Sequence, residues 1–254
     1  MEEALLLKNV SYSYHTKYGE TYALYNISMS VPKGSFVSIV GPSGCGKSTL
    51  LSLICGILKP ESGLILVNGK ESVDAGSDIG YMLQHDQLFE WRSVWGNVIL
   101  GLEIKKKKSS DNLDHISTML DQYGLGDFKG SKPSELSGGM RQRAALIRTL
   151  ALRPDILLLD EPFSALDYQT RLSVCEDISS IIKKERKTAV LVTHDLSEAI
   201  SVADTVYVLS SRPGQIVASI QTVFPPGLSS IERRNSAQFK EYFNTLWRVL
   251  NENT

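Results

Sequence analysis

A glycine-rich segment, Gly41–Ser48, has the residue types that hold the phosphate groups of a nucleotide. Its glycines let the backbone pass close to phosphate oxygens, and backbone amides at the start of a following helix favour an anion. We expect Lys47 to reach the β- and γ-phosphates and the Ser48 hydroxyl to bind Mg²⁺. The residues expected to contact the nucleotide are Gly41, Pro42, Ser43, Gly44, Cys45, Gly46, Lys47, Ser48 and Thr49.

Two consecutive carboxylates, Asp160 and Glu161, follow the apolar run Ile156–Leu159. A buried strand that ends in acids places the first carboxylate near the magnesium of a phosphoryl-transfer site, directly or through water. We therefore expect Asp160 to help bind that ion. The pattern alone leaves Glu161 open as either a general base toward the attacking water or a second metal ligand.

The elements that must position these residues alternate along the chain. Short apolar runs rich in Val, Ile and Leu are typical of strands buried on both faces. They lie at Phe36–Val40, Leu64–Val67, Ile156–Leu159, Ala189–Val192 and Val206–Leu209. Helices are expected at Lys47–Leu58, Arg141–Leu152 and Tyr168–Lys184. Strands that alternate with helices predict an α/β domain with a largely parallel sheet.

Three segments depart from this alternation. Leu5–Val10 and Tyr22–Val31 flank a polar, aromatic turn, which predicts antiparallel strands before the phosphate loop. Residues 86–136 lack buried-strand runs and contain helical stretches at Val94–Glu103 and Leu113–Tyr123. Near the end, apolar residues recur at helical spacing, which predicts a helix that packs on its own domain or binds a partner. These residues are Phe239, Tyr242, Phe243, Leu246 and Leu250.

We therefore expect one domain over residues 1–254. Residues 1–85 and 147–224 would form the α/β core with its antiparallel strands, residues 86–146 a helical subdomain, and residues 225–254 a C-terminal helical extension.

Composition narrows the possible partners. A formal net charge of -1 over 254 residues lacks the basic excess of proteins that bind the phosphate backbone, which argues against nucleic acid. The run Lys105–Lys108 is interpreted as a solvated loop. No stretch approaches the roughly 20 apolar residues of a membrane-spanning helix, and the acidic start is unlike a signal peptide. Three scattered cysteines suit a reducing cytoplasm.

The segment Leu136–Gln142, which reads LSGGMRQ, resembles the signature sequence of ABC-type ATPases. This resemblance implies that Ser137, Gly138 and Gly139 bind the γ-phosphate of ATP held mainly by another copy of the domain, using a hydroxyl, backbone amides and a helix N-terminus. It also assigns Glu161 the role of general base toward the attacking water.

Further segments resemble the family's motifs in the family's order. Tyr14 matches the aromatic residue that stacks on adenine, although Tyr12 competes for that position. Gln84 resembles the glutamine that touches magnesium and the attacking water. Asp167 ends a segment resembling the loop that couples the two sites of a dimer, and His194 matches the switch histidine at the γ-phosphate.

The resemblance extends from about residue 5 to about residue 220. It implies the P-loop NTPase fold of ABC ATPases, with an antiparallel β-subdomain and an inserted α-helical subdomain. Met140, at a signature position where many members carry glutamine, fits a narrower resemblance to importer ATPases of the nitrate, sulfonate and taurine type. Segments shared with that group are Leu136–Arg143, Asp160–Asp167 and Ser211–Gly214.

The narrower resemblance implies an energy-coupling ATPase that uses ATP and Mg²⁺. Two copies would enclose two ATP molecules on a separate permease, at the cytoplasmic face of the membrane, and would serve an extracytoplasmic binding protein indirectly. Phe89, Trp91 and Trp95 would either form a groove for a permease helix or pack in the core. The alternatives are an exporter or lipid-extraction ATPase, or a soluble ABC ATPase.

Overall fold

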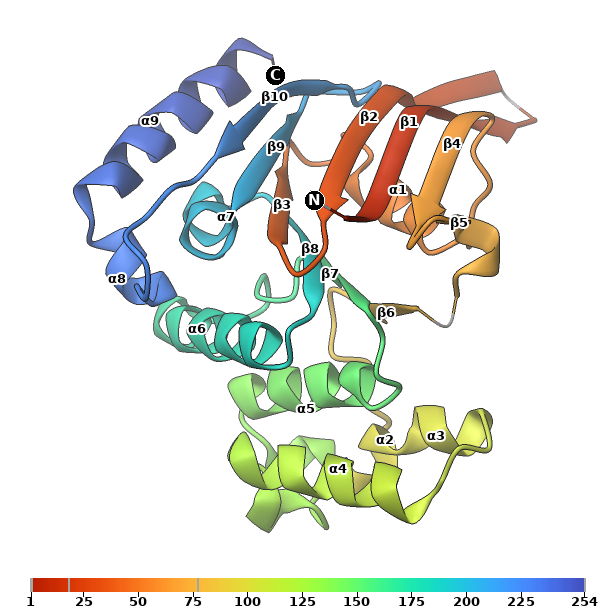
Figure 1. The fold of residues 1–254 in the computed structure, drawn as a ribbon, viewed down its shortest axis with the longest axis vertical. Helices are drawn as coiled ribbons and strands as arrows, with labels where there is room; N and C mark the ends of the chain where they lie inside the picture. The colour runs from red at the N-terminus through yellow and green to blue at the C-terminus, as the bar shows by residue number, and fades with distance from the viewer. Residues whose placement is uncertain (1, 18, 77, 254) are drawn as a thin grey trace.

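The computed structural model describes residues 2–17, 19–76 and 78–253. Within these residues two sheets lie side by side, and helices cover the larger sheet and extend below it (Figure 1). The chain thus has the architecture that the sequence predicts, an antiparallel β-subdomain joined to a mostly parallel α/β sheet.

The larger sheet has the strand order β10-β9-β3-β8-β7-β6. All neighbouring pairs are parallel except β9 and β10, which are antiparallel. Strands β3, β7 and β8 are buried along their whole lengths, as their continuous apolar runs predict. The bounds are β3 Phe36–Val40, β6 Ile79–Met82, β7 Ile156–Asp160, β8 Thr188–Thr193, β9 Thr205–Leu209 and β10 Ile216–Gln221.

The smaller sheet is antiparallel, with the order β2-β1-β4-β5. Its strands are β1 Glu3–Thr16, β2 Gly19–Pro32, β4 Ser62–Val67 and β5 Lys70–Glu71. The expectation that Leu64–Val67 belongs to the buried parallel sheet is wrong. This run lies in β4 and pairs with β1, and Leu64 remains 37% exposed because one face of the small sheet meets solvent.

The helices of the core are α1 Lys47–Ile54, α6 Tyr168–Lys184 and α7 Leu196–Val202. Helix α6 has the predicted bounds, whereas α1 ends four residues before the predicted Leu58. Gly56 explains this early end, because its φ of +73° is the left-handed conformation that follows many helix C-termini.

Helices between β6 and β7 form the layer below the larger sheet (Figure 1). They are α2 Val94–Val98, α3 Leu100–Ile104, α4 Ser110–Gln122 and α5 Gly138–Leu150, with 3₁₀ turns at Gly126–Phe128 and Pro133–Glu135. Outside this layer, a further 3₁₀ turn lies between β5 and β6 and spans Ser72–Asp74. The stretch Val94–Glu103, expected as one helix, is divided at Ile99 into α2 and α3. The expected boundary between residues 146 and 147 lies inside α5.

The C-terminal residues form α8 Ser230–Arg234 and α9 Ala237–Glu252. Leu246 of α9 is fully buried in the core of the larger sheet. The aromatic and aliphatic residues predicted on that face pack against the same core, so the helix covers its own domain. None of the described helices is long and apolar enough to cross a bilayer.

Candidate functional site

The phosphate loop connects β3 to α1, as its sequence context predicts. Two of its glycines, Gly44 and Gly46, have φ values of +76° and +108°, which disfavour other residues. A Cβ atom on Gly46 would also lie 2.9 Å from the carbonyl oxygen of Ala23. Lys47 is buried, and its Nζ donates to the carbonyls of Gly41 (2.8 Å) and Pro42 (2.9 Å). The ammonium group is therefore held against the loop that the sequence predicts to bind phosphate.

Asp160 lies at the end of β7, beside the start of α1. Its Oδ1 accepts a hydrogen bond from Ser48 Oγ at 3.2 Å, and its Oδ2 accepts one from the Tyr81 hydroxyl at 3.1 Å. Burial raises the pKa of the Asp160 carboxyl, and these two hydrogen bonds oppose the increase. The sequence does not indicate Tyr81 as a site residue, and it lies partly buried on β6, a strand that the sequence analysis does not predict.

Glu161, directly after Asp160, has a φ of +43°, an uncommon backbone conformation for a residue with a side chain. Its carboxylate Oε2 lies 3.0 Å from Nδ1 of His194, which follows β8. The ends of two neighbouring parallel strands thus bring the predicted base and the predicted switch histidine into direct contact. Backbone strain of this kind is concentrated at functional sites.

Gln84 follows β6 and completes the same region. Its Nε2 donates to Ser164 Oγ at 3.4 Å, and Ser164 Oγ donates to the carbonyl of Glu161 at 3.0 Å. A cavity of about 300 Å³ opens between these groups. Its lining residues are Ser43, Gly44, Gly46, Lys47, Ser48, Thr49, Gln84, Asp160, Glu161 and Arg212. The structure therefore brings most of the predicted phosphate and magnesium residues to one cavity.

Tyr14 and Tyr12 both compete for the position that stacks on adenine, and they differ in their surroundings. Tyr14 is 40% exposed as a residue, and its hydroxyl lies 3.0 Å from Thr49 Oγ1 on α1. Tyr12 packs partly buried against the core beneath the small sheet. The two rings meet edge to face at 5.1 Å. Tyr14 is therefore the better placed of the two for stacking on a base.

The signature residues lie apart from this cavity. Ser137 caps α5, where its Oγ accepts a hydrogen bond from the Met140 amide at 3.3 Å. Asp167 caps α6 in the same way, through the Thr170 amide at 3.1 Å. Among the described residues that line the cavity, Ser137, Gly138, Gly139 and Asp167 are absent. The chain thus does not bring its own signature to its own phosphate loop.

Arg212 is the lining residue that sequence reasoning passed over. It lies in the loop between β9 and β10, inside the shared segment Ser211–Gly214. Its guanidinium donates to the carbonyl of Gly44 from Nε (3.2 Å) and from a terminal nitrogen (2.9 Å). In the sequence this segment indicates only a resemblance to the narrower group, and nothing in its spacing indicates contact with the phosphate loop.

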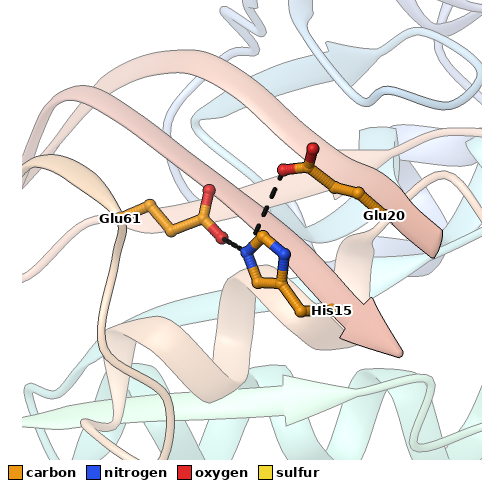
Figure 2. Close-up of side chains that lie close together, drawn as sticks. All are labelled: His15, Glu20 and Glu61. Carbon is orange, nitrogen blue, oxygen red and sulfur yellow. Dashed lines mark hydrogen bonds and ion pairs between the residues drawn. The ribbon is translucent and has the colours of Figure 1, made fainter. Parts of the chain in front are cut away.

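A further group of titratable residues lies on the small sheet (Figure 2). His15 Nε2 is 2.8 Å from the Glu61 carboxylate and 3.9 Å from that of Glu20. The His15 side chain is 66% exposed, and none of the three residues lines the cavity at the phosphate loop. Exposed pairs of this kind contribute little to stability.

Comparison with known proteins identifies the family. The model of the family described as "ABC transporter" matches residues 24–164, more than half of the chain. This chain belongs to the ABC transporter family. It is an ATP-binding subunit and an ATPase of that family, and the resemblance, fold class and enzymatic activity predicted from the sequence are confirmed.

Relatives within the ABC transporter family cover nearly the whole chain. The uncharacterized ABC transporter ATP-binding protein YtlC of Bacillus subtilis (strain 168) is 45% identical, over 97% of this chain and 95% of its own length. The nitrate import ATP-binding protein NrtD of Synechocystis sp. is 43% identical, over 88% of this chain and 84% of its own. The dimeric ATP-binding cassette MJ0796, in a post-hydrolysis state with ADP and Pi, has a TM-score of 0.74 and 30% identity, over 87% of this chain and 100% of its own.

Proposed function

We propose that this ABC ATPase is the energy-coupling subunit of an importer for a small solute of the nitrate, sulfonate or taurine type. The observation that carries the proposal is the 43% identity to a nitrate import ATP-binding protein over 88% of this chain. In this assignment the chain is a peripheral subunit at the cytoplasmic face of the membrane. It works on a separate permease, and that permease receives the solute from an extracytoplasmic binding protein.

The active site is formed by two copies of the chain, arranged head to tail. One copy contributes the phosphate loop, with Tyr14 against the adenine ring. The other contributes Ser137, Gly138 and Gly139 at the N-terminus of α5, where backbone amides favour the γ-phosphate. Asp167 links the two sites. This arrangement is supported by the separation of the signature from the cavity in one chain and by the dimeric state of the relative MJ0796.

The residues at the end of β7 suit a magnesium ion. Mg²⁺ prefers oxygen ligands, Ser48 Oγ and Asp160 Oδ1 lie 3.2 Å apart, and Gln84 lines the same cavity. A buried carboxylate with a raised pKa is also stabilised by a nearby cation. We assign Ser48, Asp160 and Gln84 as the residues that hold the ion, which would neutralise charge on the phosphates.

In hydrolysis, each remaining residue has a definite task. Lys47 binds the β- and γ-phosphates, and Gln84 orients the attacking water. Glu161 accepts a proton from that water as it attacks the γ-phosphate, and ADP leaves with the electrons of the broken P–O bond. His194, 3.0 Å from the Glu161 carboxylate, holds that side chain toward the γ-phosphate. Loss of the γ-phosphate then removes the charge that holds the two chains together.

Lys47→Ala tests whether the cavity is the ATP site. The expected result is a loss of ATP affinity of at least about tenfold, because a charge-assisted contact to phosphate disappears. Equilibrium titration of the purified chain with a fluorescent ATP analogue measures the change. Lys240→Ala, at an exposed position of α9, serves as the control. If both variants and the unaltered chain bind ATP with equal affinity, the nucleotide binds outside this cavity.

The sequence leaves two alternatives for the aromatic residues after Gln84, a groove for a permease helix or packing in the core, and these residues differ in their exposure to solvent. Trp95 packs against the core, whereas Trp91 is 72% exposed and its ring lies 4.6 Å from that of Phe89, which is 36% exposed. We propose that Phe89 and Trp91 form the contact with a cytoplasmic helix of the permease. Exposed aromatic residues are favoured anchors of protein interfaces.

Trp91→Ala is expected to weaken association with the permease by at least about tenfold, because an exposed aromatic anchor is lost, while the ATPase activity of the isolated chain is retained. Co-purification from membranes that contain the complex measures the association. Trp247→Ala is a matched control, since Trp247 is 54% exposed on α9. Equal loss in both variants would argue against a specific contact at Trp91.

The direction of transport has its own test. Isolation of the complex from membranes is expected to yield a permease together with an extracytoplasmic solute receptor. A permease that requires no receptor would instead support the exporter alternative.

A further inference from the structure

The loop between β9 and β10 lies directly against the phosphate loop. Arg212 donates two hydrogen bonds to the carbonyl of Gly44, at 3.2 Å from Nε and 2.9 Å from a terminal nitrogen. Gly44 has a φ of +76° and lines the cavity. The guanidinium thus binds the phosphate loop at Gly44, whereas the Lys47 ammonium binds the carbonyls of Gly41 and Pro42 in the same loop.

The backbone that carries Arg212 is held in place by the small sheet. The amide of Gly214 donates to the carbonyl of Ala23 at 2.9 Å, and the amide of Tyr25 donates to the carbonyl of Gly214 at 3.0 Å. A Cβ atom on Gly214 would lie 2.3 Å from the carbonyl oxygen of Cys45. The loop therefore packs on both β2 and the phosphate loop, and this contact fixes the origin of the Arg212 side chain.

The charges around the cavity show why a second cation matters. Among the described residues that line it, Lys47 and Arg212 are cationic, and Asp160 and Glu161 carry carboxylates. Without Arg212, the charged side chains of the lining would carry a net negative charge when both acids are ionised. A negative charge opposes the binding of a polyphosphate. No ion pair with Arg212 occurs within the described part of the chain.

The guanidinium also keeps donors for a ligand. A guanidinium carries five N–H groups, and the hydrogen bonds of the described residues use Nε and one terminal nitrogen, both toward Gly44. Its planar donors match the geometry of phosphate oxygens.

We propose that Arg212 is a further nucleotide-binding residue, the second cation that receives the phosphate groups of a nucleoside triphosphate or diphosphate. This role rests on the proposed binding of ATP at the phosphate loop. Because Arg212 is exposed and comes from outside the phosphate loop, it contributes to affinity for the phosphates rather than to the chemical step.

Three substitutions separate charge from hydrogen bonding. Arg212→Gln keeps a donor for Gly44 without the charge, Arg212→Lys keeps the charge, and Arg212→Ala removes both. Binding of ADP and of ATP is measured by calorimetry at low and high salt, and steady-state hydrolysis gives KM and kcat. Arg248→Gln, at an exposed position of α9, is the control.

Arg212→Gln is expected to raise the Kd of both nucleotides and the KM for ATP about fivefold at low salt, with kcat nearly unchanged. High salt should reduce the difference, and Arg212→Lys should restore most of the affinity. Unaltered Kd and KM in Arg212→Gln would overturn the proposal, as would a loss of kcat and thermal stability at constant affinity. Normal ATP binding by Lys47→Ala would show that the nucleotide does not occupy the phosphate loop, and the role of Arg212 would fail with that placement. Loss of ATP binding in Lys47→Ala with unaltered binding in Arg212→Gln would overturn the role of Arg212 alone.

Discussion

Glu161→Gln is expected to lower the rate of ATP hydrolysis by about 10²- to 10⁴-fold, because it removes the group that accepts a proton from the attacking water. The amide is close in size to the carboxylate and can still hydrogen-bond to His194, which lies 3.0 Å away. Asp160 and Ser48 are unchanged, so binding of ATP and magnesium should persist. The variant should therefore accumulate as an ATP-bound dimer. Phosphate release and size-exclusion chromatography with and without ATP measure these two effects.

Glu241→Gln, at an exposed position of α9, is the matched control for loss of a carboxylate. It is expected to hydrolyse ATP at the rate of the unaltered chain. Full turnover by Glu161→Gln would remove Glu161 from the role of general base. Loss of ATP binding in that variant would instead assign its carboxylate to the metal, the alternative that the sequence pattern leaves open.

Ser137→Asp tests the claim that two chains share each site. Aspartate caps helices as well as serine, so the hydrogen bond from the Met140 amide and the start of α5 are retained. The added negative charge, however, would face the γ-phosphate of the partner's ATP. We expect normal ATP binding by the single chain, no ATP-dependent dimer, and hydrolysis reduced by about 10²- to 10³-fold, the effect of losing an anion-stabilising donor. Ser109→Asp, at the cap of α4, is the control.

Mixing two inactive variants makes this test sharper. A dimer of one Ser137→Asp chain and one Lys47→Ala chain contains one composite site with both an intact phosphate loop and an intact signature. If the signature acts on the partner's nucleotide, the mixture should hydrolyse ATP faster than either variant alone. A mixture no more active than its components would contradict the shared site.

Short sequence patterns were sufficient where the structure is local. The glycines and lysine of Gly41–Lys47 specify a loop between a buried strand and a helix, because positive φ values and close backbone packing require glycine there. Helix α6 has the predicted bounds, since its cap Asp167 and its apolar periodicity are both local signals. The phosphate loop and the carboxylates after β7 could therefore be selected as candidates before the fold was known.

Contacts between distant segments were not predictable in the same way. The run Leu64–Val67 is as apolar as a central strand, yet only its pairing with β1 decides that it lies in the small sheet. Tyr81 resembles any aromatic strand residue until β6 and β7 pair in parallel and bring its hydroxyl to Asp160. Arg212 reaches Gly44 because the packing of Gly214 on β2 and the phosphate loop fixes its position.

The sequence by itself thus determined the family of this ABC ATPase and its candidate chemical groups. These are a loop predicted to bind phosphate, two acidic residues predicted to serve as metal ligand and general base, and a signature segment. Residue type and spacing suffice for these because each depends on a few neighbouring residues. Only the tertiary structure decided which of these groups share a cavity. Parallel pairing of β6, β7 and β8 brings Gln84, Glu161 and His194 together at one sheet edge, while the helical layer carries Ser137 away from it.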